Sequence, residues 1–309
     1  MKRLAPFALL LLTAQAPAPP RPALAPSEIV AAAPASDWVA IAASDLLVMD
    51  LAPLAGKSRR LVMQMMPRAL TSGGHVENVR DLAKAHWWDG TSVNRVQENY
   101  VVQWGDATEK KPLPAGLRTI SEAAYEVAER DLARSRGALE KERPLARLLR
   151  RDAYATYVDF EDGWAIASNL EGRFWPIHCY GMVGVGRGMS PETGSGAELY
   201  TVIGHAPRHL DRNIAVVGRV IEGIEHLSSL PRGTGGLGFY EKAEERVPIV
   251  SIRLGDEVAG LPAYQFLSTE SDSFARYADA RANRRDAFFI TPAGGADICN
   301  IPVPVRRKP

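Results

Sequence analysis

The order of apolar and polar positions predicts a chain built mainly from short β-strands. Leu46–Asp50 and Leu61–Met66 are apolar runs separated by a turn that contains proline and glycine, which predicts a hairpin. Residues 93–103 again have a strand-like pattern, and from residue 152 onward short apolar runs alternate with glycines. These later runs are Tyr154–Phe160, Trp164–Ser168, Met182–Val185, Leu199–Ile203, Ile214–Val220 and Val247–Leu254. Many short strands with few helices favour a β-barrel or sandwich over a parallel α/β sheet.

Three segments have helical spacing instead. Residues 75–85 carry apolar side chains three and four positions apart, and Ser271 begins a predicted helix that runs to Arg285. Between them, residues 121–151 form a charged stretch. Its apolar residues, of which Tyr125 is the first, recur at helical spacing and fall on one face. The seven arginines of this stretch are expected to face solvent, with a docking face for a partner as the alternative.

The first 25 residues are typical of an export signal. Residues 1–12 begin with two basic side chains and continue as an apolar run, and two Ala-x-Ala sites follow before a Pro- and Ala-rich spacer ends. We therefore expect a periplasmic or secreted protein, with an N-terminal core helix as the alternative. In an oxidising compartment Cys179 and Cys299 can pair, although their separation in sequence leaves open whether they form a disulfide or two free thiols.

Composition narrows the function classes. The chain has 309 residues, 46% of them hydrophobic, and its 37 basic side chains nearly balance 36 acidic ones. The balance argues against a broad basic surface for nucleic acid. No uninterrupted apolar run is long enough for a membrane-spanning helix, and two cysteines are too few for a cysteine-built zinc site.

Two motif-like patterns do not support cofactor or metal chemistry. Residues 181–188 are rich in glycine, but the third glycine of a dinucleotide-binding G-x-G-x-x-G loop is missing, because Met189 follows Gly188. His205 and His209 have the spacing of helical zinc ligands, but Pro207 lies between them and favours a turn. We predict no cofactor and no metal site.

Five segments resemble parts of the cyclophilin family of peptidyl-prolyl isomerases. Residues 93–106, VNRVQENYVVQWGD, are similar to the family signature F-H-R-[VI]-x-x-x-F-x-[VIC]-Q-G-G-D. Residues 181–184 resemble the strand that enters the family's glycine-rich loop, and residues 196–200 stand where the family has G-S-Q-F-F. Residues 216–223 match its V-F-G-x-V-x-x-G strand and turn, and residues 75–82 resemble its T-A-x-N-F-x-x-L helix.

The resemblance implies a fold that is mainly β: a closed antiparallel eight-stranded barrel with flanking helices. It places a cyclophilin-like domain at residues 38–258 in an exported, bacterial-like member of the family. A helical insertion over about residues 107–174 interrupts this domain. Residues 259–309 form a C-terminal extension that we expect to pack against the barrel, tied at Cys179 if the cysteines pair.

The resemblance also implies a site and an activity. Arg95 and Gln103 match the catalytic positions, where the arginine stabilises the twisted prolyl amide and the glutamine hydrogen-bonds the substrate backbone. The implied substrate-binding residues are Tyr100, Val101, Gly186, Glu198, Tyr200, His209 and Leu210. The expected function is cofactor-independent cis-trans isomerisation of proline-containing or unfolded polypeptides, assisting the folding of exported proteins. The alternatives are a catalytically weak peptide-binding module or holdase chaperone, or a structural part of an envelope complex, and the partner of the insertion is unknown.

Several positions depart from the family pattern. Trp104 replaces a glycine, His209 falls where many members carry tryptophan, and residues 186–188 replace a substrate-contacting Ala-Asn-Ala-like run. Glu198 stands in place of a glutamine, and its charge is expected either to orient the Arg95 guanidinium or to compete for it. The loss of the tryptophan predicts weak binding of cyclic-peptide inhibitors that dock on it.

Overall fold

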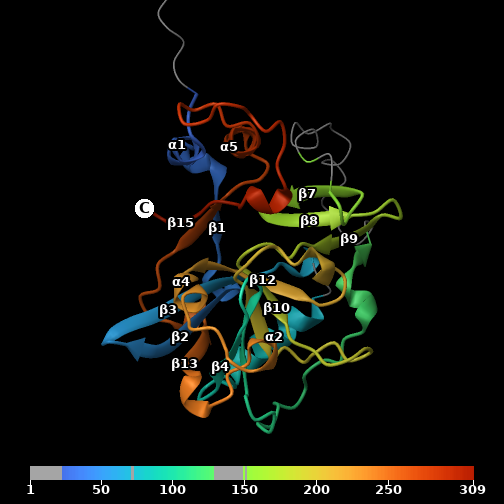
Figure 1. The fold of residues 1–309 in the computed structure, drawn as a ribbon, viewed down its shortest axis with the longest axis vertical. Coiled ribbons are helices and arrows are strands. Elements are labelled where there is room, and N and C mark those ends of the chain that lie inside the picture. Colours follow the sequence, from blue (N-terminus) through green and yellow to red (C-terminus); the bar gives the residue numbers. More distant parts are fainter. Residues whose placement is uncertain (1–22, 71–72, 129–148, 150–151) are drawn as a thin grey trace, which may run out of the picture.

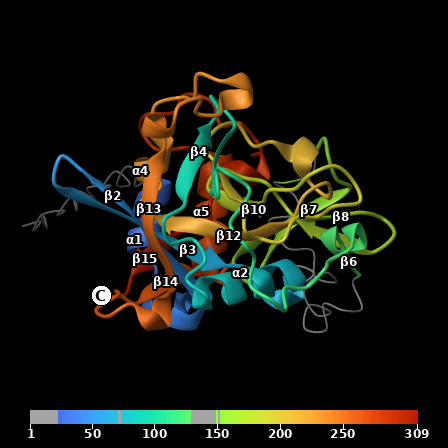
Figure 2. The ribbon, with the colours of Figure 1, turned by 90° about the horizontal axis from the view of Figure 1, so that it is seen from below.

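Eight antiparallel strands close into one barrel (Figures 1 and 2), in the order β10-β11-β5-β4-β13-β2-β3-β12. The computed structural model describes residues 23–70, 73–128, 149 and 152–309. The barrel strands are β2 (Leu46–Leu54), β3 (Lys57–Met65), β4 (Ser92–Val96), β5 (Val101–Gly105), β10 (Met182–Val185), β11 (Leu199–Val202), β12 (Val216–Glu222) and β13 (Val247–Leu254). The predicted closed eight-stranded barrel is confirmed, as is the hairpin of β2 and β3. The predicted signal peptide falls largely on residues 1–22, which lie outside the described residues.

Side-chain alternation on each strand separates the barrel core from its outer surface. On β5, Val102 and Trp104 are fully buried in the core, and Gln103, between them, points to the opposite face. The predicted strand over residues 93–103 is two strands, because Asn99 adopts a positive φ of 51° and turns the chain between β4 and β5. The predicted helix is α2 (Gly74–Lys84), which packs its apolar face on the same core.

The remaining helical elements are short apart from one in the C-terminal extension. The α-helices are α1 (Pro26–Ala31), α4 (Glu225–Ser228) and α5 (Asp272–Ala282). The 3-10 turns are η1 (Ala35–Asp37), η2 (Ala43–Asp45), η3 (Arg68–Leu70), η4 (Glu122–Tyr125), η6 (Arg208–Leu210), η7 (Gly236–Gly238), η8 (Ala243–Glu245), η9 (Gly255–Glu257) and η10 (Ile298–Asn300). None of the helices in the described part of the chain is long and apolar enough to span a bilayer.

Beside the barrel, and mostly within the predicted insertion, lies a four-stranded antiparallel sheet (Figure 2), in the order β6-β9-β8-β7. Its strands are β6 (Val127–Ala128), β7 (Tyr157–Glu161), β8 (Trp164–Ser168) and β9 (Arg173–Pro176). Most of the predicted helix over residues 121–151 lies outside the described residues. Where residues 121–128 are described the helix prediction is wrong, because a single 3-10 turn is followed by pairing of Val127 with Phe174. Sheet hydrogen bonding to β9 there overrides the local helical spacing.

The C-terminal extension lies on one side of the barrel together with the first described residues (Figure 1). Here β1 (Trp38–Ile41), β14 (Tyr264–Leu267) and β15 (Val305–Arg307) form a three-stranded sheet, and α1 packs on α5. The predicted start of α5 is confirmed, since the Ser271 side chain accepts a hydrogen bond from the backbone N–H of Phe274 at 3.1 Å. A separate apolar core joins this unit to β7, β8 and β9.

A disulfide between Cys179 and Cys299 ties the extension to the barrel domain. Cys179 lies between β9 and β10, and Cys299 lies in η10. Of the two states that the sequence left open, the structure has the paired one. The bond therefore fixes the segment between β9 and β10 to the C-terminal extension.

Candidate active site

The strand register places four residues side by side on the outer face of the barrel. Arg95 on β4 pairs with Gln103 on β5, and Gln103 in turn pairs with Tyr200 on β11. Tyr200 pairs with Gly184 on β10. Residues more than a hundred positions apart in the chain thus form one continuous row.

A small pocket of about 120 Å³ opens over this row. It is lined by Arg95, Tyr100, Val101, Gln103, Gly186, Arg187, Tyr200, Leu210 and Ile214. The structure therefore brings together seven of the nine predicted site residues, while Glu198 and His209 lie next to the pocket without lining it. Its volume is below the ~300–1,000 Å³ of pockets for drug-sized ligands, so it suits a single side chain.

The Arg95 guanidinium is held by three acceptors. Its Nε donates to the carbonyl oxygen of Leu237 at 2.8 Å, its Nη1 donates to Gln103 Oε1 at 3.2 Å, and its Nη2 donates to Gln97 Oε1. Partial burial lowers the pKa of Arg95, an effect that the nearby Tyr100 opposes. Arginine stays protonated even so, and two of its five N–H groups remain without an acceptor among the described residues.

The Glu198 carboxylate lies behind Gln103 and acts on Arg95 only through it. Gln103 Nε2 donates to Glu198 Oε2 at 3.5 Å, so that the amide oxygen of Gln103 faces Arg95. Burial raises the pKa of Glu198, against hydrogen bonds from Gln103 and Asn94 that lower it. Of the two predicted effects of Glu198, the geometry fits orientation of the guanidinium, because the amide separates the two charges.

Glycine at position 105 leaves room for this carboxylate in its present position. A Cβ atom added to Gly105 would lie 1.9 Å from Glu198 Oε1. The Gly-Asp that follows Gln103 and Trp104 in the sequence therefore leaves the space that Glu198 occupies.

The apolar side of the pocket is built from aromatic and aliphatic side chains. Val101 and Tyr200 are buried and form a small cluster with Val202, against which Tyr100 and Ile214 pack. Outside the lining, His209 stacks on Tyr100 with ring centroids 6.2 Å apart and ring planes 10° apart.

Residues 71–254, more than half of the chain, match the family model described as cyclophilin type peptidyl-prolyl cis-trans isomerase/CLD. The chain belongs to the cyclophilin family. Its activity is the cis-trans isomerisation of peptidyl-prolyl bonds.

One solved structure shares the fold at low sequence identity. The crystal structure of cyclophilin AquaCyp293 from Hirschia baltica is 19% identical, with a TM-score of 0.63, over 87% of this chain and 92% of that one. A cyclophilin-type isomerase from Cryptosporidium parvum, crystallised in the presence of the dipeptide Ala-Pro, is 11% identical with a TM-score of 0.35, over 63% of this chain and 92% of that one. No curated protein matches the chain.

The sequence interpretation missed one loop of this cyclophilin that contacts Arg95. Phe239 lies with its ring centroid 5.2 Å from the Arg95 guanidinium carbon, and Leu237 supplies the carbonyl that accepts from Nε. A Cβ on Gly238 would come within 2.7 Å of the Gln97 Cα atom, so the loop approaches the barrel very closely. The run of four glycines within residues 233–238 was the available signal for that approach.

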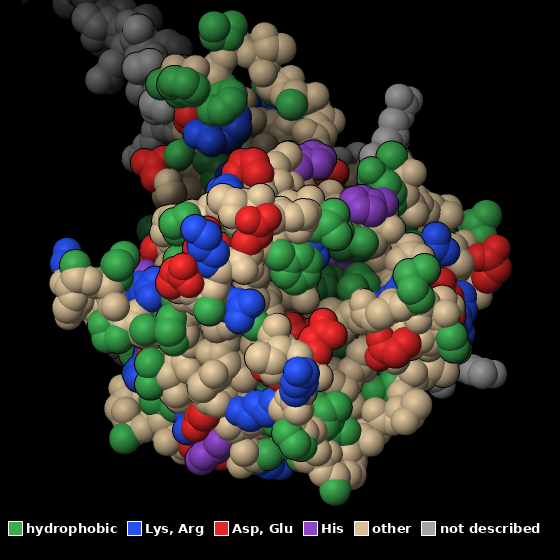
Figure 3. All heavy atoms as spheres, turned by 60° about the horizontal axis from the view of Figure 1, so that its bottom comes forward, with side chains coloured by type: hydrophobic (Ala, Val, Ile, Leu, Met, Phe, Trp, Pro, Cys, Tyr) green, Lys and Arg blue, Asp and Glu red, His purple; other side chains and the backbone are tan. Residues whose placement is uncertain are grey.

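The charge around the cyclophilin barrel is mixed. Figure 3 shows basic and acidic side chains interspersed with hydrophobic ones over one face of the molecule. In the part of the chain that the structure describes, no three His, Cys, Asp or Glu side chains cluster in a way that could hold a metal ion.

Proposed function

We propose that this cyclophilin isomerises X-Pro bonds in unfolded, exported polypeptides and that Arg95 stabilises the twisted amide. Rotation about the bond has a barrier of about 18–20 kcal/mol because the planar amide is stabilised by resonance. Rotation breaks that resonance and gives the prolyl nitrogen a lone pair. A group that bonds this lone pair binds the twisted state better than either planar state, which lowers the barrier.

The observation that carries the proposal is the position of the Arg95 guanidinium at an apolar pocket the size of one side chain. Three acceptors fix its plane, and two N–H groups remain to bond the prolyl nitrogen. No carboxylate pairs with Arg95 within the described residues, so its charge is not neutralised in the resting protein.

The neighbouring groups supply the other contacts. Tyr200, Val101 and Leu210 offer apolar surface for the proline ring. Gln103 uses one N–H on Glu198, which leaves its second N–H for a carbonyl oxygen of the substrate backbone. No nucleophile or general base is needed, because no covalent bond is made or broken.

The size of the effect can be bounded. A hydrogen bond to a charged group contributes about 1.5–3 kcal/mol, and about 1.4 kcal/mol corresponds to a tenfold change in rate. Substitution Arg95→Ala should therefore lower kcat/KM for a proline tetrapeptide about 10- to 100-fold. The matched Arg95→Lys variant keeps the charge, but its three N–H donors cannot both satisfy the three acceptors and bond the prolyl nitrogen, so it should recover only part of the loss.

Equal rates for wild type and Arg95→Ala would remove Arg95 from the mechanism. If, in addition, prevention of client aggregation survived the substitution, the peptide-binding or holdase alternative would be favoured. A protease-coupled isomerisation assay run beside a light-scattering assay on one refolding client separates these outcomes.

Two features support action outside the cytoplasm. The N-terminal sequence is typical of a secretory signal, and a disulfide such as Cys179–Cys299 persists best in an oxidising compartment. Cell fractionation of the full-length chain tests this proposal, and recovery of uncleaved protein in the cytoplasm would contradict it.

A further inference from the structure

The hydroxyl of Tyr200 points away from the pocket that its ring lines. The side chain is buried, and its hydroxyl oxygen lies 2.8 Å from His178 Nε2. The two rings are nearly parallel, with planes 7° apart and centroids separated by 6.2 Å. Tyr200 is therefore fixed from behind, by a residue that lies between β9 and β10.

His178 is in turn held by Asp211. The Asp211 Oδ1 atom accepts from the backbone N–H of His178 at 3.0 Å and lies 2.9 Å from its Nδ1. In the neutral imidazole this puts the proton on Nδ1 and leaves Nε2 as an acceptor. Burial raises the pKa of Tyr200, so its hydroxyl keeps its proton and donates it to Nε2.

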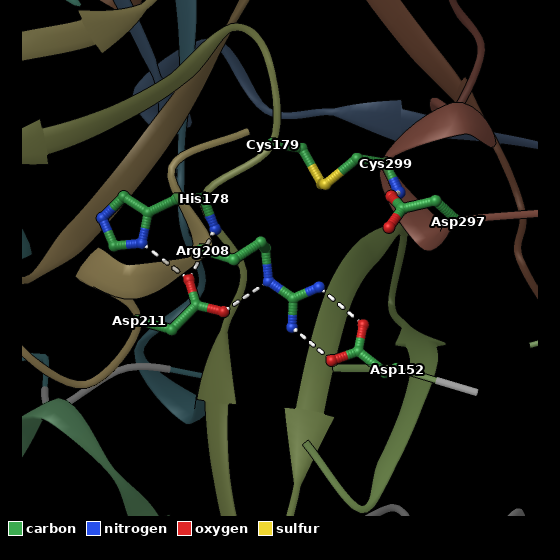
Figure 4. The surroundings of a disulfide bond; sticks show 7 residues. All are labelled: Asp152, His178, Cys179, Arg208, Asp211, Asp297 and Cys299. Atoms are coloured by element: carbon green, nitrogen blue, oxygen red, sulfur yellow. Dashed lines mark hydrogen bonds and ion pairs between the residues drawn. A yellow bond between two sulfur atoms is a disulfide. The ribbon is translucent and has the colours of Figure 1, made fainter. Parts of the chain in front are cut away.

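Two further ion pairs extend the chain of contacts to Asp152, which lies within the predicted insertion (Figure 4). Arg208 Nε donates to Asp211 Oδ2 at 2.6 Å, and its two Nη atoms donate to Asp152 at 2.6 and 3.1 Å. The side chains of His178, Asp211, Arg208 and Asp152 are each 5% exposed or less. We call these four residues the buried relay.

The buried relay supports two walls of the pocket. At one end it holds the Tyr200 ring, and within η6 it holds Arg208, two positions before the lining residue Leu210. Cys179 follows His178 directly, so the disulfide fixes the same short segment (Figure 4).

Stability alone gives little reason for such a group. A buried ion pair is often no more stabilising than apolar residues of similar volume, because each charge loses its hydration. It does fix orientation, since every hydrogen bond in it is directional and has one geometry. We therefore assign to these buried charges the role of fixing the position of the Tyr200 ring.

We propose that the buried relay is a positioning device for the prolyl pocket, through which Asp152, within the predicted insertion, sets the affinity for substrate. The inference rests on the proposed pocket but does not depend on the role of Arg95. It assigns no chemical step to His178 or Asp211, which act through Tyr200 and do not touch the substrate.

The test measures binding of an Ala-Pro tetrapeptide by calorimetry, beside KM, kcat and the melting temperature. Tyr200→Phe removes only the hydroxyl and should raise Kd and KM about 3- to 10-fold with kcat within twofold, and His178→Gln should act in the same direction. Asp152→Asn, at the far end of the buried relay, should raise Kd about 2- to 4-fold. The control Asp89→Asn breaks an ion pair of 2.7 Å with Arg253, away from the pocket, and should leave Kd unchanged.

A double variant separates positioning from a general loss of stability. If Asp152 acts through the Tyr200 hydroxyl, Asp152→Asn should have no further effect on Kd in the Tyr200→Phe background. Equal weakening in both backgrounds would overturn the inference, as would wild-type Kd values in all variants with only a lower melting temperature. Because Kd is measured without turnover, failure of Arg95→Ala to slow isomerisation would refute the proposed mechanism and leave this inference standing.

Discussion

Tyr200 lies across Gly184 so closely that a Cβ atom at position 184 would clash with its ring. A Cβ atom added there would come within 2.3 Å of both Cζ and the hydroxyl oxygen of Tyr200. The ring cannot move aside easily, because His178 holds its hydroxyl at 2.8 Å. The absence of a side chain at Gly184 on β10 therefore allows the Tyr200 ring on β11 to take its position in the pocket wall.

The substitution Gly184→Ala should destabilise the protein by about 1–3 kcal/mol, the usual cost of overpacking a tight contact. Urea unfolding of wild type and variant measures this difference. In a Tyr200→Leu background the clash is absent, so the same substitution should cost much less. An equal cost in both backgrounds would show that the strain lies elsewhere on β10.

The buried Glu198 carboxyl predicts a pH dependence of stability. Its pKa is raised above 4.5, chiefly by burial, so the folded state favours the protonated form more than the unfolded state does. The stability associated with protonated Glu198 is thus fully present below the unfolded pKa and is lost as pH rises through the folded pKa. Glu198→Gln should remove this loss.

Thermal unfolding between pH 3.5 and 8 checks the sign. The Glu198→Gln variant should melt above wild type at neutral pH, and the difference should shrink below about pH 4. The exposed Glu244→Gln variant controls for removal of any one acidic charge and should follow wild type. Parallel pH profiles for wild type and Glu198→Gln would contradict the prediction.

The disulfide predicts a large loss of stability on reduction. It closes a loop with a sequence separation of 120, and loop-closure entropy alone gives about 4.7 kcal/mol for a loop of ~100 residues, although measured values are commonly 2–4 kcal/mol. Cys299→Ser should lower the free energy of unfolding by a value in this range.

Reductant provides the control for that variant. Wild type in dithiothreitol should fall to the stability of Cys299→Ser, and the variant itself should not respond. A wild type that is insensitive to reductant while Cys299→Ser is destabilised would mean that the serine, and not the lost bond, causes the effect.

The motifs that resemble the family predicted seven of the nine residues that line the pocket, and Arg187 and Ile214 were not among them. Alternation on β5 and the spacing of the motif from Arg95 to Gln103 identify neighbours along one hairpin, and the segment containing Tyr200 lies in a second motif. These residues lie side by side because antiparallel pairing sets residues of neighbouring strands opposite one another.

The buried relay had no such signal. His178 and Asp211 are 33 positions apart and Arg208 and Asp152 are 56 apart, on segments that no common motif joins. Asp and Arg are usually exposed and His is intermediate, so nothing local marks these residues as buried. The helix expected near Tyr125 failed for a related reason, since pairing with β9 comes from a distant part of the chain.

Phe239 should contribute to catalysis through Arg95 without touching the reacting bond. Its ring lies 5.2 Å from the guanidinium carbon and is 39% exposed, which corresponds to a cation–π contribution of about 0.5–1 kcal/mol. Phe239→Ala should therefore lower kcat/KM about 2- to 5-fold. Because the guanidinium would be less well fixed in the twisted state, kcat should fall and KM should change little.

Phe239→Trp keeps an aromatic face under the cation and serves as the matched control. It should retain wild-type kcat, whereas Phe239→Leu, which is apolar but has no π-face, should behave like the alanine variant. In the Arg95→Ala background Phe239→Ala should have no further effect on kcat. A comparable loss of kcat in that background would show that Phe239 contacts the substrate directly. Phe239 would then act on the bound peptide and not through Arg95.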